Sequence, residues 1–158
     1  MNVFIAAHQE ILELMLKHEV EFMLIGGYAV IYYGYMRTTG DMDLWLKPTN
    51  DNKFNMCKVF DEAGYEAQDI MALENLNFEK KIVFSIGSLV HKIDFHTHID
   101  FIQYHEAEKN KVIAIIDEMK LPIIHLNDLI LSKMNTDRLK DKADIEELQR
   151  INQLKPSH

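Results

Sequence analysis

The residues best suited to do chemistry in this chain are two aspartates, Asp41 and Asp43, which open the apolar run that contains Leu44 and Trp45. Side chains at positions i and i+2 of a β-strand share one face, so this spacing predicts that the two carboxylates converge. Like charges held close together are unfavourable unless a cation lies between them. Mg²⁺ prefers such oxygen ligands and often shares them with substrate phosphates, so the pair indicates a metal site that acts on a phosphate.

A third carboxylate, Asp94, lies between the apolar residues Ile93 and Phe95. On a strand those two side chains face one way and Asp94 faces the other. If this strand lies beside the strand of the first pair, three carboxylates form one site, which can hold two metal ions about 3.5–4 Å apart. His96 shares the predicted face of Asp94, which leaves open whether it lines the site or is an ordinary strand residue. The alternative for all three aspartates is an ordinary role as loop or edge-strand charges.

Gly26 and Gly27 directly follow the short apolar run at residues 22–25, which is typical of a buried strand that enters a turn. Two glycines leave their backbone N–H groups open to an anion, because no side chain stands in the way. A helix predicted over residues 28–35 directs the positive end of its dipole to the same place. The segment therefore fits a triphosphate cradle, and the alternative is a simple tight turn.

Periodicity predicts the elements that must position these groups. The predicted helices cover residues 3–19, 28–35, 51–64, a segment that opens at 125–130, and 139–153. The predicted strands cover residues 22–25, 43–47, 81–85 and 91–97, and the last two are joined by a hairpin turn at Gly87 and Ser88. In the helix at 51–64 the residues predicted to face inward are Phe54, Cys57, Val59 and Phe60. Residues 111–124 fit either a strand or a helix. This order predicts an α+β fold with a small mixed β-sheet flanked by helices.

Length, charge and cysteine content exclude several classes of protein. The 158 residues fit one domain over residues 1–158, with a core at about 20–100 and a C-terminal helical part at about 125–153. The net charge of −8 argues against general binding to duplex DNA, because phosphate contacts need a cationic surface. The lone Cys57 cannot form an internal disulfide, which predicts a reducing, cytoplasmic location. The sequence lacks a long uncharged apolar run, so no membrane span is predicted.

The order of these motifs resembles the signature of the DNA polymerase beta-type nucleotidyltransferases: Gly-Gly, then Asp-x-Asp in an apolar strand, then a lone Asp on a later strand. The form Arg-x-Thr-x-Asp-x-Asp-Leu-x-Leu, from Arg37 to Leu46, resembles the small bacterial and archaeal members. Those members include nucleotidyltransferases of toxin–antitoxin and phage-defence pairs and small antibiotic nucleotidyltransferases. Residues 126–133 and 138–145 resemble their C-terminal helices, so the resemblance implies a polymerase beta-like fold that ends in helices.

This resemblance implies an enzyme that transfers a nucleoside monophosphate from a nucleoside triphosphate to a hydroxyl acceptor, with two Mg²⁺ ions bound and pyrophosphate leaving. It implies that Asp41 and Asp43 ligate both metals, and that Asp94 ligates the acceptor-side metal and helps to deprotonate the hydroxyl. The implied contacts to phosphate or nucleotide are Gly26, Gly27, Arg37, Thr38, Lys133 and Lys140. For the two lysines the alternative is a solvated helix face.

The sequence leaves the acceptor open among a protein side chain, a tRNA end and a small hydroxylated molecule. A second hypothesis is a catalytically silent protein of the same fold that acts by binding a partner protein, as the antitoxin-like half of a pair. The presence of all three carboxylates favours the enzyme. The step from such a site to a particular substrate is analogy, because one fold serves many functions.

Overall fold

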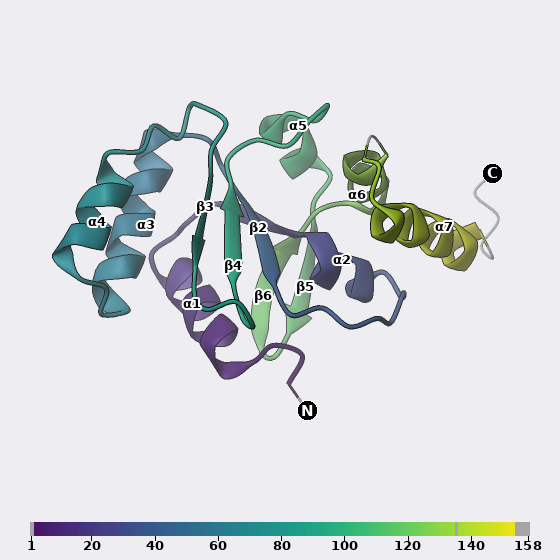
Figure 1. Ribbon diagram of the computed structural model, residues 1–158, viewed down its shortest axis with the longest axis horizontal. Coiled ribbons are helices and arrows are strands. Elements are labelled where there is room, and N and C mark those ends of the chain that lie inside the picture. Colours follow the sequence, from purple (N-terminus) through teal and green to yellow (C-terminus); the bar gives the residue numbers. More distant parts are fainter. Residues whose placement is uncertain (1, 135, 154–158) are drawn as a thin grey trace.

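The computed structural model, which describes residues 2–134 and 136–153, contains one mixed six-stranded β-sheet (Figure 1). The strand order is β3-β4-β2-β1-β6-β5. The pairs β1–β6 and β2–β4 are parallel, and the pairs β1–β2, β3–β4 and β5–β6 are antiparallel. The strands are β1 (Phe22–Ile25), β2 (Met42–Leu46), β3 (Val83–Ile86), β4 (Ile93–His96), β5 (Val112–Ile116) and β6 (Met119–Ile123). The predicted α+β fold with a mixed sheet is confirmed.

The described residues also form seven helices, which flank this sheet. They are α1 (Ala6–Lys17), α2 (Gly26–Tyr32), α3 (Asn50–Glu62), α4 (Ala67–Glu74), α5 (Tyr104–Lys109), α6 (Leu126–Lys133) and α7 (Leu139–Gln153). In Figure 1 the pair α3 and α4 lies at one end of the molecule, and the pair α6 and α7 lies at the other end, beyond α2. Within the two described ranges, no helix is both long enough and apolar enough to span a membrane.

The central strands β2 and β4 present two different faces. Leu44, Ile93 and Phe95 are buried and belong to the apolar core. Asp43 and Asp94 alternate with these residues and are only partly buried. Because successive side chains of a strand point to opposite faces, the core holds one face of this strand pair in place and leaves the carboxylates on the other. The predicted alternation around Asp94 is therefore confirmed, and the neighbours of Asp43 are buried in the same way.

The residues 111–124, for which helix and strand were both open, form the antiparallel hairpin of β5 and β6. Its two turn residues, Asp117 and Glu118, have φ angles of 50° and 67°. A two-residue type I′ turn requires positive φ at both positions. The usual signal for such a turn is Asn-Gly or Asp-Gly, and neither is present here. The local sequence therefore did not distinguish the hairpin from a helix.

Some predicted boundaries and one predicted orientation differ from the structure. The helix expected at 28–35 begins at Gly26 and ends at Tyr32, and β2 begins at Met42, so Asp41 lies just outside the strand. The helices α4 and α5 were not predicted. Phe54 was predicted to face inward, but this was wrong, because its side chain is 52% exposed. The buried side of α3 is set by Met56 and the residues three and four positions later, and Phe54 lies about 200° around the helix from Met56.

Candidate active site

Asp43 and Asp94 lie side by side on neighbouring parallel strands. They are direct partners in the register between β2 and β4, so both side chains project from the same face of the sheet. The side chain of Asp43 is 29% exposed and that of Asp94 is 18% exposed. Two carboxylates that are both partly screened from water and this close together favour the binding of a cation.

Each of these carboxylates is held by a different set of protein donors. The Nε2 atom of His96 lies 3.1 Å from Oδ1 of Asp43, where its N–H donates to the carboxylate. The hydroxyl of Ser85, the partner of Asp94 across the β3–β4 hairpin, donates to Oδ1 of Asp94. The ammonium of Lys92 lies 3.5 Å from the same oxygen. Because the pairs are separate, the two carboxylates are stabilised without sharing a single donor.

Asp41 lies in a bend before β2, so the rule that places residues i and i+2 on one face does not extend to it. Its carboxylate lines the same cleft as Asp43 and Asp94. Burial raises the pKa of Tyr28, and the negative charge of Asp41 raises it further by a smaller amount. Within residues 2–134 and 136–153, no three Asp, Glu, His or Cys side chains lie close enough together to form a ready metal cluster. The convergence of all three aspartates on metal stays a prediction.

The two glycines at the start of α2 allow close packing against the site. Gly26 has a φ of 68°, and a β-carbon there would lie 2.5 Å from Oδ2 of Asp43. A β-carbon at Gly27 would lie 2.6 Å from Oγ1 of Thr39, whose hydroxyl donates to the carbonyl oxygen of Asp41. Only glycine fits such contacts, and only glycine adopts the backbone of residue 26 without strain. The absence of side chains at the two glycines thus lets Asp43 and Thr39 pack directly against the start of α2, and the contact of the glycines with phosphate stays a prediction.

We expect Gly26→Ala to destabilise the protein more than Gly64→Ala, which is a matched control. Gly64 also has a positive φ of 88°, but a β-carbon there would meet no atom within 4 Å. The control should therefore lose only about 1–2 kcal/mol of unfolding free energy through backbone strain. Gly26→Ala should lose about 1–3 kcal/mol more, because the new methyl group overlaps Asp43. Urea unfolding of both variants measures the difference, and equal losses would show that the contact with Asp43 is unimportant.

A buried ionic network joins the C-terminal helices to the segment that precedes β2. The ammonium of Lys133 lies 3.1 Å from Asp141 and 3.0 Å from Asp144, and both carboxylates are buried. The guanidinium of Arg37 donates from Nε and Nη2 to the two oxygens of Asp144, at 2.8 and 3.0 Å. Arg37 also donates to the carbonyl oxygen of Thr38. Arg37 and Lys133 are thus engaged with the protein itself, and the side chain of Thr38 is not among those that line the cleft.

Asp141 receives donors from three residues, Lys133, Thr136 and Arg138. Burial by itself would raise the pKa of Asp141, but hydrogen bonds from Thr136, Lys133 and Arg138 outweigh it and hold the pKa below its ordinary value. The side chain of Arg138 is largely exposed, and its Nε atom lies 2.8 Å from Asp141. This arrangement orients Arg138 beside the cleft while its remaining N–H groups stay accessible.

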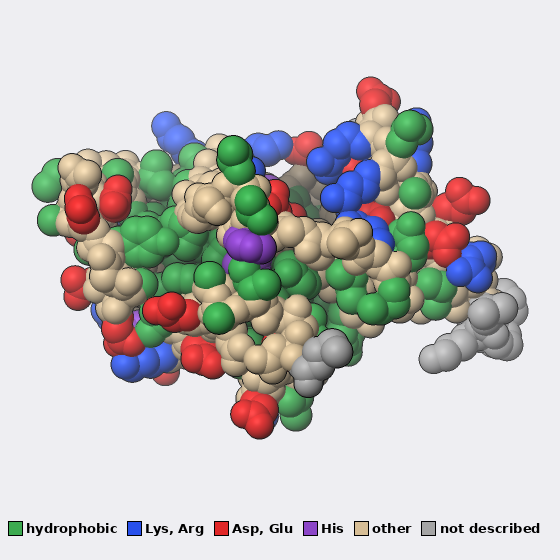
Figure 2. Space-filling view, turned by 60° about the horizontal axis from the view of Figure 1, so that its bottom comes forward, with side chains coloured by type: hydrophobic (Ala, Val, Ile, Leu, Met, Phe, Trp, Pro, Cys, Tyr) green, Lys and Arg blue, Asp and Glu red, His purple; other side chains and the backbone are tan. Residues whose placement is uncertain are grey.

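The carboxylates lie in a cleft of about 490 Å³ between the sheet and the C-terminal helices. In addition to the three aspartates and Gly27, its lining includes Lys92, Arg138 and Lys140. Figure 2 shows Lys and Arg side chains gathered over the C-terminal helices beside a hollow of the surface. The sequence predicted Lys140, but it did not identify Ser85, Lys92 or Arg138 as site residues. Lys92, two positions before Asp94 and on the same predicted face, is the one that the alternation pattern would have revealed.

The comparisons with known proteins agree with this geometry. A family model described as "Nucleotidyltransferase of unknown function (DUF6036)" matches residues 2–156. The chain belongs to this family of nucleotidyltransferases. The expected enzyme class and nucleotide transfer as its general activity are confirmed by that membership. No curated protein matches the chain.

Several solved nucleotidyltransferases share the fold. The lincosamide antibiotic adenylyltransferase LnuA, solved with lincomycin bound, is 17% identical with a TM-score of 0.58, and the match covers 96% of this chain and 99% of that one. A putative nucleotidyltransferase from Thermotoga maritima is 12% identical with a TM-score of 0.55, over 94% and 92% of the two chains. ANT(2")-Ia in complex with adenylyl-2"-tobramycin is 11% identical with a TM-score of 0.55, over 94% and 92%. At these identities the likeness shows the fold, and it confirms the predicted nucleotidyltransferase fold.

Proposed function

We propose that this family member transfers a nucleoside monophosphate from a nucleoside triphosphate to a hydroxyl group in a Mg²⁺-dependent reaction. The observation that carries the proposal is the pairing of Asp43 with Asp94 across two parallel strands, inside a cleft whose other lining includes Lys92, Arg138 and Lys140. Oxygen ligands on one side and cationic side chains around them suit a metal-bound triphosphate. The single domain over residues 1–158 would carry the whole site.

The residues present fit Mg²⁺. Asp43 and Asp94 offer hard oxygen ligands from the same face, and Asp41 lines the same cleft. His96 donates to Asp43 and Ser85 donates to Asp94. These donors balance part of the negative charge of the two neighbouring carboxylates. The bound ions would polarise the phosphate and neutralise charge that develops on it.

The residues of this chain would position the reactants and move one proton. The acceptor oxygen forms a bond to the α-phosphorus, and the bond from the α-phosphorus to the bridging oxygen of the β-phosphate breaks, so pyrophosphate leaves with that electron pair. The proton of the acceptor hydroxyl passes to the carboxylate of Asp94 and then to water. Lys140 and the free N–H groups of Arg138 stabilise the charge on the leaving phosphates. Holding both reactants in line supplies much of the rate enhancement in such reactions.

The other predicted nucleotide contacts divide into two groups in this proposal. Gly27 and Lys140 line the cleft, and Gly26 lines a small space beside Asp43, so these three are placed to contact the triphosphate. Arg37 and Lys133 are bound to Asp144, so we assign them to hold the glycine turn and the C-terminal helices in place. Thr38, whose carbonyl oxygen accepts from Arg37, belongs to this second group.

The acceptor is proposed to be a small hydroxylated molecule. This choice rests on the solved structures of the same fold, one bound to lincomycin and another to an adenylylated tobramycin, which are proteins that act on small molecules. A protein side chain and a tRNA end are the other acceptors that the chemistry permits. Incubation of the protein with labelled triphosphates, Mg²⁺ and separate small-molecule, protein and tRNA fractions of a lysate tests the choice, and label found only in protein or tRNA would contradict it.

We expect Mg²⁺ together with a nucleoside triphosphate to raise the melting temperature. A ligand at one hundred times its dissociation constant adds about 2.7 kcal/mol of stability, which corresponds to about 5–10 °C for a chain of this size. Thermal unfolding with each of the four triphosphates, with and without a chelator, makes the measurement. The chelator should abolish the shift. If none of the four triphosphates changes the melting temperature, the proposed function is wrong.

A further inference from the structure

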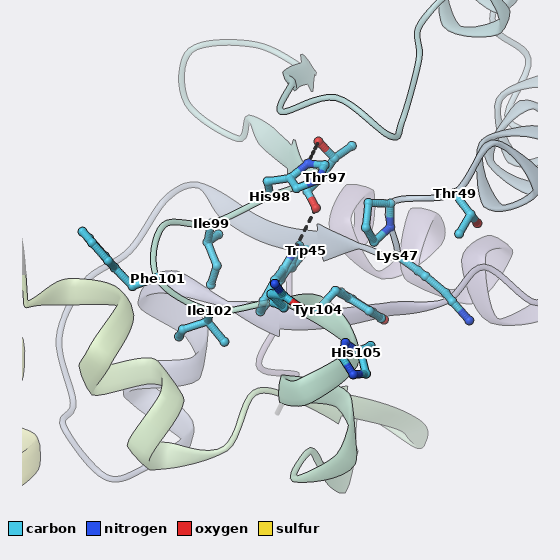
Figure 3. Close-up of a pocket in the computed structure, with 12 residues that line it drawn as sticks. Trp45, Lys47, Thr49, Thr97, His98, Ile99, Phe101, Ile102, Tyr104 and His105 are labelled. Carbon is cyan, nitrogen blue, oxygen red and sulfur yellow. Dashed lines mark hydrogen bonds between the residues drawn. The ribbon is translucent and has the colours of Figure 1, made fainter.

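A second chamber, of about 670 Å³, lies past the C-terminal ends of β2 and β4 (Figure 3). Trp45 and Tyr104 form part of its wall, with their rings edge to face and 5.2 Å between centroids. The indole N–H of Trp45 donates to the carbonyl oxygen of Thr97 at 2.9 Å, and both residues are buried. Packing and a hydrogen bond thus hold the aromatic wall in one orientation. The volume is within the range of small-molecule sites, about 300–1,000 Å³.

The lining of this chamber suits a neutral, apolar group. Among the described residues that form it, none is Asp or Glu. Its one fixed cation, Lys47, is balanced by Glu21 at 3.3 Å. A charged ligand would lose hydration in such a place without gaining an opposite charge. The chamber therefore differs in chemistry from the catalytic cleft, which is lined by carboxylates, lysines and an arginine.

The chamber lies next to the candidate active site. Ile99 lines both the chamber and a smaller space of about 170 Å³, and that space is also lined by Asp43 and His96. Asp94 and Thr97 are three residues apart on the same stretch of chain, so about 10 Å separates the carboxylate pair from the chamber wall. A ligand that occupies both the chamber and the reacting position must therefore be about 10 Å long.

Phe101 lies at the edge of this chamber, as the third residue of the turn from Ile99 to Ile102. Its φ is 70°, a value that bulky residues rarely adopt outside such turns, and the residue is 71% exposed. The bridge between Ile99 and Ile102 closes the turn that presents it. A flat apolar group in the chamber would cover the exposed ring.

We propose that this chamber binds the apolar end of a neutral, hydroxylated acceptor, whose hydroxyl reaches the Asp43–Asp94 pair. The inference rests on the proposed function and specifies its acceptor: a molecule about 10 Å long with a flat apolar group at one end and a hydroxyl group at the other. Phe101 at the edge of the chamber and Ile102 contact the apolar end, with the buried Trp45 behind the wall, and Ile99 lines both the chamber and the small space beside Asp43.

Phenyl β-D-glucopyranoside is a suitable probe, and methyl β-D-glucopyranoside is the matched ligand without the flat apolar group. Trp45 is the only tryptophan of the chain, so its indole N–H gives one signal in the NMR spectrum of the ¹⁵N-labelled protein. The phenyl compound should shift this signal and the amide of Ile102 with a dissociation constant of about 0.1–1 mM. The methyl compound should leave both signals in place at the same concentrations.

Phe101→Gly should weaken binding of the phenyl compound about fivefold to tenfold, because one aromatic contact is lost. Glycine accepts the positive φ of residue 101, so this variant keeps its fold. The control Phe54→Ala removes another exposed phenylalanine ring, on α3, and should bind as the unaltered protein does. No saturable shift with the phenyl compound, or equal affinity in Phe101→Gly, overturns the inference.

The thermal shift with Mg²⁺ and triphosphate, measured on the same samples, separates this inference from the proposed function. A normal thermal shift without binding of the phenyl compound overturns the chamber as the acceptor site and leaves the nucleotide site standing. Binding of the phenyl compound without any thermal shift contradicts the proposed function, and the acceptor role of the chamber with it. Both responses together support the inference.

Discussion

Asp43→Asn is expected to lower nucleotidyl transfer about a thousandfold or more while the protein stays folded. Asp43 is the carboxylate that lies opposite Asp94, contacts His96 and packs against Gly26, so it is at the centre of the site. Asparagine keeps the size of the side chain and can still accept from His96. It removes the negative charge that a divalent cation needs. Transfer of label from a triphosphate, measured at saturating Mg²⁺, gives the loss directly.

The same substitution should leave the unfolding free energy unchanged or slightly increased, because it relieves repulsion between two neighbouring carboxylates. Asp61→Asn is the matched control, since Asp61 is an exposed aspartate on α3, away from the cleft. Its transfer rate should equal that of the unaltered protein. Full activity in Asp43→Asn would show that the carboxylate pair does not carry the reaction, even if the triphosphate binds.

Asp144→Ala is expected to cause the largest loss of stability of any single change proposed for this chain, about 3–5 kcal/mol of unfolding free energy. Asp144 is buried and is shared by Arg37 and Lys133. Its removal leaves two cations in a poorly solvated place with one carboxylate fewer, and an unpaired buried charge is far more unfavourable than a lost surface pair. The loss corresponds to a fall of about 6–20 °C in melting temperature.

Two further variants make this result specific. Glu146→Ala changes an exposed acid on the same helix and should alter the unfolding free energy by no more than about 0.5 kcal/mol. Asp144→Asn keeps the shape of the side chain and part of its hydrogen bonding, so its loss should be smaller than that of alanine. A loss below about 1 kcal/mol for Asp144→Ala would mean that water, or movement of Arg37 and Lys133 toward solvent, replaces the lost carboxylate. The ionic network would then not be what holds the C-terminal helices in place.

The local sequence by itself determined the strands that hold the candidate metal-binding aspartates. The alternation of Asp94 with Ile93 and Phe95 predicted its face, and the observed burial agrees. The order of glycine pair, Asp-x-Asp and lone aspartate predicted the family, which the family model confirms over residues 2–156. These features are short-range, since they depend on a period of two residues and on side chains that are close in the sequence.

The tertiary structure decided which distant residues share the site. The register of β2 with β4 brings Asp43 beside Asp94, and the β3–β4 hairpin brings Ser85 to the same carboxylate. The sequence gives no period that fixes the register between strands so far apart in the chain, because register depends on the pairing and packing of the whole sheet.

The tertiary structure also decided the roles of the cationic residues. Arg37 and Lys133, predicted as nucleotide contacts, are paired with a carboxylate on α7. A lysine on a helix looks the same in the sequence whether it faces solvent, a phosphate or a buried aspartate. The environment of Lys133 depends on how α6 packs on α7, and the contact of Arg37 with Asp144 joins residues 107 positions apart. Such contacts determine the charge and shape of the cleft. The sequence therefore identified the candidate catalytic aspartates, whereas only the tertiary structure showed which cationic residues support them.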